Sequence, residues 1–147
     1  MKKLFLSIAL VALVFGVAGC EKVEKGNYKE GTYEATVVDD YNNENNIASA
    51  KIVIDANGKI ESVYLDTTYK GSTKKALKDD YNMKKFNSNA AGEWYEQVEK
   101  LEKAIVENQG LDTIKLNSDG TTDAVSGCTI KINALYNAVK DALAKAK

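Results

Sequence analysis

Residues 123–129 read Asp-Ala-Val-Ser-Gly-Cys-Thr, and no other stretch of the chain says as much about its fold. Small residues at the start of a helix let several backbone N–H groups point at one spot, where they favour a bound phosphate. Thr129 adds a nucleophilic hydroxyl at that spot. The stretch therefore predicts a C-terminal helix whose N-terminus holds a phosphate beside an attachment site. The predicted apolar face of this helix contains Ile132, Leu135, Tyr136, Val139 and Leu143.

The same residues also allow a plainer interpretation. Asp123 or Ser126 is a common N-cap residue, and Gly127 suits a tight turn before a helix. The stretch by itself leaves both interpretations open, so the remainder of the chain has to separate them.

The N-terminus has the pattern of a secretory signal. Residues 1–3 are basic after the initiating Met, and residues 4–14 are nearly all apolar. Residues 17–20 read Val-Ala-Gly-Cys, which resembles a bacterial lipobox, where the Cys is lipidated and becomes the first residue of the mature chain. We expect residues 1–19 to be a lipoprotein signal peptide and Cys20 to carry the lipid. The alternative is an ordinary signal or anchor in which Cys20 is incidental.

The residues after Cys20 divide into a short tether and one domain. Residues 20–30 are polar and charged without periodicity, which is typical of a tether that holds a domain away from the membrane. Residues 31–147 are long enough to form a single domain with its own core.

Composition excludes several classes of function. The chain contains no His, so neither a Ser-His-Asp nor a Cys-His catalytic arrangement can form. The two Cys residues, Cys20 and Cys128, have no ligand spacing, so we expect no zinc or haem site. The formal net charge is −1 at pH 7, and a mildly acidic chain is not expected to bind nucleic acid.

The N-terminal half of the domain predicts a small antiparallel sheet. Residues 32–38 and 48–54 have strand patterns, separated by an Asn- and Asp-rich loop. Residues 55–58 contain the Asn-Gly turn signal, and residues 59–65 predict a third strand. The short turn makes the second and third strands an antiparallel hairpin.

A long helix is predicted from about residue 90 to residue 108, ended by Gly110. Tyr81 and Met83 lie in the segment just before it, where an adaptable Met suits an irregular binding surface. The lysine pairs are expected on solvated faces. Lys131 is expected on the exposed surface of the C-terminal helix, and the alternative is that it assists in binding the phosphate. The apolar face of the long helix contains Trp94, Val98, Leu101 and Ile105.

The stretch 123–129 resembles the flavinylation motif of FMN-binding domains. That motif reads Asp, a small residue, any residue, Ser or Thr, Gly, Ala, Thr, and a flavin transferase joins the phosphate of FMN to its final Thr through a phosphoester. Cys128 departs from the usual Ala, but Cys behaves as a small hydrophobe and we expect it to be tolerated. The matching positions are Asp123, Ser126, Gly127 and Thr129.

Further segments carry the same resemblance. Residues 31–33 (Gly-Thr-Tyr) and 57–60 (Asn-Gly-Lys-Ile) are similar to the N-terminal sheet of FMN-binding domains. Residues 79–81 (Asp-Asp-Tyr) and 93–97 (Glu-Trp-Tyr-Glu-Gln) resemble the flavin-binding repeats of extracellular electron-transfer lipoproteins.

The resemblance implies an α+β fold, with a small antiparallel sheet packed against a long helix and a C-terminal helix. It also implies FMN as cofactor, covalently linked to Thr129. Trp94 and Tyr95 could flank the flavin ring, but a core anchor is the favoured interpretation for Trp94. The expected cofactor-binding residues are Asp123, Ser126, Gly127, Cys128, Thr129, Tyr81 and Met83.

The family includes subunits of the sodium-pumping NADH:quinone oxidoreductase and of the Rnf complex, besides the extracellular electron-transfer lipoproteins. The resemblance thus implies an electron carrier anchored by lipid on the extracytoplasmic face of the cell membrane. Its expected partners are a flavin transferase for maturation and a membrane dehydrogenase or quinol as electron donor. One alternative is a surface lipoprotein that binds flavin or another small phosphorylated ligand non-covalently, as a sensor or scavenger. Another is that Cys128 is a reactive thiol with a lowered pKa at a helix N-terminus.

Overall fold

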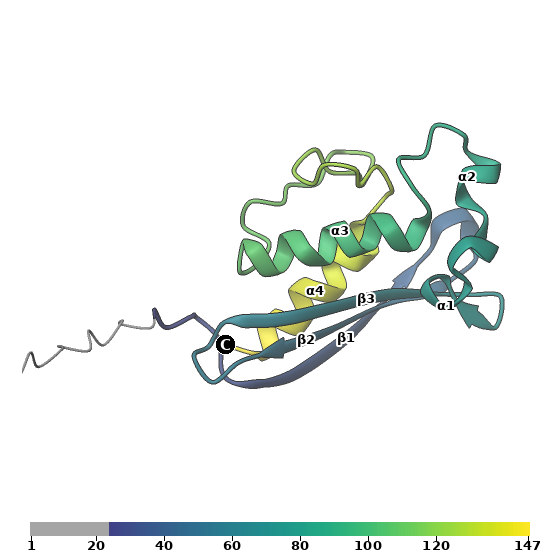
Figure 1. Ribbon diagram of the computed structural model, residues 1–147. Helices are drawn as coiled ribbons and strands as arrows, with labels where there is room; N and C mark the ends of the chain where they lie inside the picture. The colour runs from purple at the N-terminus through teal and green to yellow at the C-terminus, as the bar shows by residue number, and fades with distance from the viewer. Residues whose placement is uncertain (1–23) are drawn as a thin grey trace, which may run out of the picture.

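An antiparallel sheet with two helices on one of its faces makes up the body of the computed structural model (Figure 1). The structure describes residues 24–147, so the predicted signal peptide, residues 1–19, and the lipidation site Cys20 lie outside it. Among residues 24–147, no helix combines the length and the apolar character needed to cross a membrane.

The sheet has the strand order β1-β2-β3-β4, with every neighbouring pair antiparallel. Asp55 shapes the turn between β2 and β3, because its carboxylate accepts hydrogen bonds from the N–H of Asn57 (2.8 Å) and of Lys59 (2.9 Å). Gly58 adopts φ +76°, the conformation for which an Asn-Gly turn selects glycine. The predicted hairpin is therefore confirmed. The strands are β1 (Gly31–Asp39), β2 (Asn46–Ile54), β3 (Ile60–Tyr69) and β4 (Ser72–Thr73).

Strand β3 continues four residues past its predicted end at residue 65. The polar sequence Asp66-Thr67 ends the apolar pattern, yet both residues are buried and Thr67 pairs with Ala48 of β2. The Asp66 carboxylate accepts hydrogen bonds from the N–H of Thr67 (2.8 Å) and of Lys75 (3.1 Å), so its burial is compensated.

Within residues 24–147, four α-helices and two single 3₁₀ turns complete the fold. Helix α3 packs on β3, and α4 packs on β1 and β2, on the same side of the sheet (Figure 1). Alternate strand residues such as Ile52 and Leu65 are fully buried against these helices, which confirms the predicted α+β arrangement. The helices are α1 (Lys74–Leu77), α2 (Met83–Phe86), α3 (Trp94–Glu107) and α4 (Asn133–Lys145), and the 3₁₀ turns are η1 (Tyr41–Asn43) and η2 (Lys78–Tyr81).

The predicted apolar face of the long helix is confirmed, since Trp94, Val98, Leu101 and Ile105 are all buried. Residues 26–29, which the sequence assigns to the tether, contact the domain. Gly26 and Tyr28 donate backbone hydrogen bonds to the β2–β3 turn, and Lys29 donates one to Ala146 at the C-terminus.

The C-terminal helix begins later than its sequence pattern suggests. The prediction of a helix directly after Thr129 is wrong, because α4 starts at Asn133. Cys128, Ile130 and Ile132 are buried while the residues between them are exposed, which is the two-residue alternation of an extended chain. The β-branched Ile residues favour that conformation.

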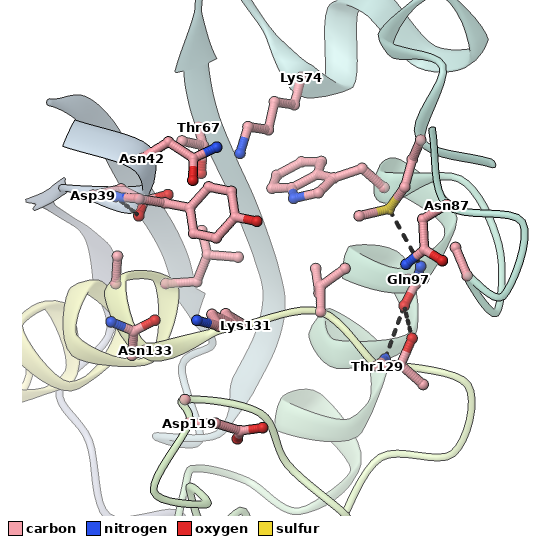
Figure 2. Close-up of a pocket in the computed structure, with 18 of the residues that line it drawn as sticks. Asp39, Asn42, Thr67, Lys74, Asn87, Gln97, Asp119, Thr129, Lys131 and Asn133 are labelled. Atoms are coloured by element: carbon pink, nitrogen blue, oxygen red, sulfur yellow. Dashed lines mark hydrogen bonds between the residues drawn. The ribbon is translucent and has the colours of Figure 1, made fainter. Parts of the chain in front are cut away.

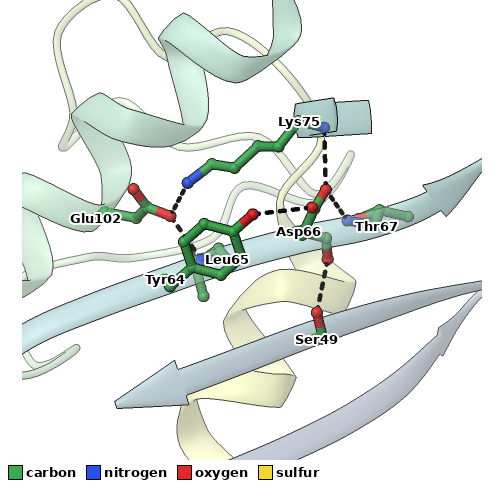
Figure 3. Close-up of polar contacts among 7 residues, drawn as sticks. All are labelled: Ser49, Tyr64, Leu65, Asp66, Thr67, Lys75 and Glu102. Atoms are coloured by element: carbon green, nitrogen blue, oxygen red, sulfur yellow. Dashed lines mark hydrogen bonds and ion pairs between the residues drawn. The ribbon is translucent and has the colours of Figure 1, made fainter. Parts of the chain in front are cut away.

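Polar side chains of α3 cover the outer edge of β3. The Glu102 carboxylate accepts the N–H of Leu65 (2.6 Å) and forms an ion pair with Lys75 of α1 (Figure 3). Gln109, just after α3, accepts the N–H of Ile60 (2.8 Å) and donates to its carbonyl (3.0 Å). These contacts satisfy backbone groups that an edge strand would otherwise leave unpaired.

The Lys75–Glu102 pair gives the first testable prediction. Burial raises the pKa of the Glu102 carboxyl, whereas the Lys75 ammonium and the Leu65 N–H oppose that rise. Lys75→Met leaves a buried carboxylate without its cation and should lower the free energy of unfolding at pH 7 by about 3 kcal/mol in urea titrations.

The loss should depend on pH. Without Lys75 the folded-state pKa of Glu102 rises further above its unfolded value. The loss of unfolding free energy is therefore complete above this raised folded-state pKa and shrinks as the pH falls through it, because Glu102 becomes protonated. Lys103→Met is the matched control, because the Lys103–Glu107 pair on the same helix is 76% and 63% exposed and should contribute under about 0.5 kcal/mol. Equal losses for the two variants would contradict a structural role for the buried pair.

Candidate functional site

A pocket of about 880 Å³ lies between the ends of the strands, the short helices, α3 and the loops that precede α4 (Figure 2). This volume lies in the range of small-molecule binding sites, about 300–1,000 Å³. Charged and polar side chains at its wall include Asp39, Asn42, Thr67, Lys74, Asn87, Gln97, Asp119, Thr129, Lys131 and Asn133.

Thr129 is held at the pocket wall by Gln97. The Gln97 side-chain oxygen accepts hydrogen bonds from the backbone N–H (2.8 Å) and the hydroxyl (3.1 Å) of Thr129 (Figure 2). Thr129 itself is exposed, whereas Gln97 is completely buried. The hydroxyl is therefore fixed in position and still accessible to a reactant from the pocket.

Gln97 is in turn fixed by the start of α3. Its amide donates to the carbonyl of Gly92 (2.8 Å) and lies 3.5 Å from the sulfur of Met83. Glu93 and Glu96 form a capping box at the first turn of α3, and the Glu93 carboxylate also accepts the N–H of Met83 (2.8 Å). The segment 93–97 thus joins α3, α2 and the Thr129 loop into one wall.

Aromatic side chains form another part of the wall. Tyr81 packs edge-on to Trp94 at 6.5 Å between ring centroids and to Tyr69 at 5.0 Å. Trp94 is buried in the core, as predicted, and also lines the pocket. Burial raises the pKa of Tyr81 to about 12, so its hydroxyl stays protonated at neutral pH. Tyr81 and Met83 both line the pocket, and Tyr95 does not.

Four predicted binding residues, Asp123, Ser126, Gly127 and Cys128, do not line the pocket. Asp123 accepts a hydrogen bond from the side chain of Asn117, which lies in the pocket wall (3.3 Å). Gly127 has φ +75°, so it permits the turn that presents Thr129. These residues shape the loop, and Thr129 is the part of it that reaches the pocket.

Cys128 is 1% exposed and packs in the core. Burial raises the pKa of its thiol to about 11. The alternative of a reactive thiol with a lowered pKa is therefore wrong.

The N-terminus of α4 also faces the pocket. Asn133, Ala134 and Leu135 line the pocket, and the N-cap residue Ile132 offers no side-chain acceptor to the N–H groups of this first turn. Lys131 also lines the pocket, with its ammonium 5.6 Å from the ring centroid of Tyr41. It lies in the extended segment before α4 and not on a helix surface.

Most of the pocket wall was not expected from the sequence, and two of the missed residues, Gln97 and Lys74, matter most for the site. Gln97 is a polar residue on the apolar face of α3, and that position is a signal that could have identified it. Lys74 was expected on a solvated face together with Lys75, which is wrong, because Lys74 is 6% exposed and Lys75 is ion-paired to Glu102. Nothing in the local sequence separates the two lysines.

Comparison with protein families identifies the domain. Residues 45–144 match the family described as FMN-binding domain, and this match covers more than half of the chain. Neither a curated protein nor a solved structure matches the chain. The matched residues include Gln97, Thr129 and most of the pocket wall. The chain therefore binds flavin and belongs to the FMN-binding domain family.

Proposed function

We propose that this protein carries electrons through FMN that is joined by a phosphoester to the hydroxyl of Thr129. The observation that carries the proposal is the accessible Thr129 hydroxyl, held by the buried Gln97 at the wall of a large pocket. FMN supplies the redox chemistry when bound, and the chain supplies its binding, orientation and electrostatic environment.

The residues in the pocket fit the two ends of FMN. Trp94 and Tyr81 offer apolar aromatic surface for a planar heterocycle. Thr129, Lys131 and the uncapped first turn of α4 all line the pocket, so an attachment oxygen, a cation and free N–H groups are available to the phosphate end. Backbone N–H groups and a positive helix end favour an anion there. This arrangement requires neither a His side chain nor a metal ion.

We further propose that the domain is anchored by lipid on Cys20 and works on the extracytoplasmic face of the membrane. The support is the basic, apolar and small-residue order of residues 1–20. Anchoring keeps a carrier at high local concentration near a membrane dehydrogenase or quinol that donates electrons. A flavin transferase is the partner required for maturation.

Thr129→Ala should abolish covalent flavin, because the proposed acceptor oxygen is removed. Peptide mass mapping of the wild-type protein, produced together with a flavin transferase, should place FMN on the tryptic peptide Leu116–Lys131. Thr129→Ser keeps a hydroxyl and should retain partial loading. Full loading of Thr129→Ala would rule out this site of attachment.

Gln97→Leu should slow flavin incorporation by about tenfold or more, because two donors of Thr129 lose their common acceptor and the hydroxyl is no longer fixed. The unsatisfied buried groups should also cost about 1–3 kcal/mol in thermal or urea unfolding. Gln109→Leu is the matched control, since Gln109 bonds to Ile60 away from the pocket. Incorporation as fast in Gln97→Leu as in Gln109→Leu would argue against the positioning role.

Cys20→Ala should remove the anchor while leaving the pocket intact, because the residues that line the pocket all fall between Asp39 and Leu135. Fractionated cells should show the variant either released or unprocessed, and purified protein should still take up FMN on Thr129. Recovery of processed, lipidated Cys20→Ala protein from membranes would disprove the lipid anchor.

A further inference from the structure

Lys74 places a positive charge in the pocket. It is the first residue of α1, is 6% exposed, and lines the pocket wall. Its ammonium lies 5.3 Å from the ring centroid of Tyr81 and 5.3 Å from that of Trp94. Figure 2 shows the side chain pointing into the pocket toward the aromatic wall. The charge therefore sits beside the surface that suits a flavin ring.

Among the described residues, the ammonium of Lys74 forms no ion pair. Within residues 24–147 the ion pairs are formed by Lys51, Lys75 and Lys103, and no hydrogen bond from Lys74 Nζ is present. Among the described residues, every fully buried side-chain nitrogen has a hydrogen-bond partner. Lys74 Nζ has none in this part of the chain, so it is not fully buried and stays in contact with the open pocket. Burial lowers the pKa of Lys74, and the charges of Asp39, Glu44 and Asp66 oppose this.

An unpaired cation in this position is costly for the free domain. The neighbouring Lys75 is also enclosed, but its charge is paired with Glu102. Lys74 has no such partner within residues 24–147, so docking of α1 alone does not explain why its charge is buried. Interaction with the faces of two aromatic rings compensates part of the cost. An electron-rich ligand in the pocket would compensate the rest.

On the basis of the proposed function, we propose that Lys74 contacts the flavin ring and raises the reduction potential of the bound FMN. Its location favours the ring over the phosphate. Thr129, the proposed attachment point, bonds to Gln97, whereas Lys74 lies against Trp94. Trp94 is three residues from Gln97 along α3, which is about 4.5 Å of helix rise. Lys131 is the other cation among the described residues of the pocket wall, and its ammonium lies 5.6 Å from the ring centroid of Tyr41.

The charge change on reduction gives Lys74 its effect. A reductant such as dithionite is oxidised as it transfers an electron pair to the ring, and water supplies a proton, which leaves negative charge on the reduced ring at neutral pH. A fixed cation beside the ring favours that reduced state over the uncharged oxidised ring.

The test compares wild type, Lys74→Gln and Lys70→Gln, each loaded by a flavin transferase and titrated spectroelectrochemically. Lys70 is the matched control, because its ammonium also lies 5.0 Å from an aromatic ring centroid, that of Tyr69, but Lys70 is exposed and does not line the pocket. At a fixed ambient potential, Lys74→Gln should lower the ratio of reduced to oxidised flavin about tenfold, a shift of about 30 mV for a two-electron couple. Lys70→Gln should match wild type, and Lys74→Arg should remain close to it.

An unchanged ratio in Lys74→Gln, or the full shift in Lys131→Gln instead, would overturn the proposal for Lys74. A second measurement uses the wild-type chain alone, in case Lys74→Gln does not fold. Limited acetylation with acetic anhydride, quantified by mass spectrometry, should show Lys74 protected after FMN loading and Lys70 unchanged. Equal labelling of Lys74 before and after loading would also overturn it.

These results separate the two proposals. Wild-type protein that acquires no FMN on Thr129 contradicts the proposed function before any potential is measured. Wild-type protein that loads normally but shows neither a Lys74 shift nor Lys74 protection contradicts the role of Lys74 alone.

Discussion

The side-chain amide of Gln97 is the contact on which the site depends. It is completely buried, and its oxygen holds both the N–H and the hydroxyl of Thr129 while its nitrogen binds the carbonyl of Gly92. A buried amide is stable only when its donors and acceptors are paired, so the Thr129 loop and the start of α3 must be present together. The accessible hydroxyl is therefore a product of the packed core and not of a flexible loop.

Helix α3 connects this contact to the rest of the domain. Glu93 and Glu96 cap its start, and Glu93 also binds the α2 segment, while Glu102 and Gln109 satisfy the outer edge of β3. Its apolar face packs into the core against the sheet. A single amphipathic helix thus fixes the sheet edge, the aromatic wall and Thr129, which explains why polar residues occur along it at specific positions.

Sequence patterns predicted the elements better than the site. The Asn-Gly turn and the apolar spacing of α3 identified the hairpin and the long helix, because both patterns act locally. The end of β3 was missed because buried Asp66 relies on distant donors, and the start of α4 was missed because Ile130 and Ile132 follow an extended alternation. Thr129 was found through a motif, whereas Gln97 and Lys74 acquire their roles only through tertiary contacts.

We propose that the pocket presents Thr129 to FMN for covalent attachment. The most direct measurement is the visible absorbance of wild-type protein, produced with and without a flavin transferase, after denaturation and separation from small molecules. We expect flavin absorbance to stay with the denatured chain only when the transferase is present. Flavin that separates from the chain on denaturation, in the presence of an active transferase, would contradict this proposal and indicate a domain that binds flavin without a covalent bond.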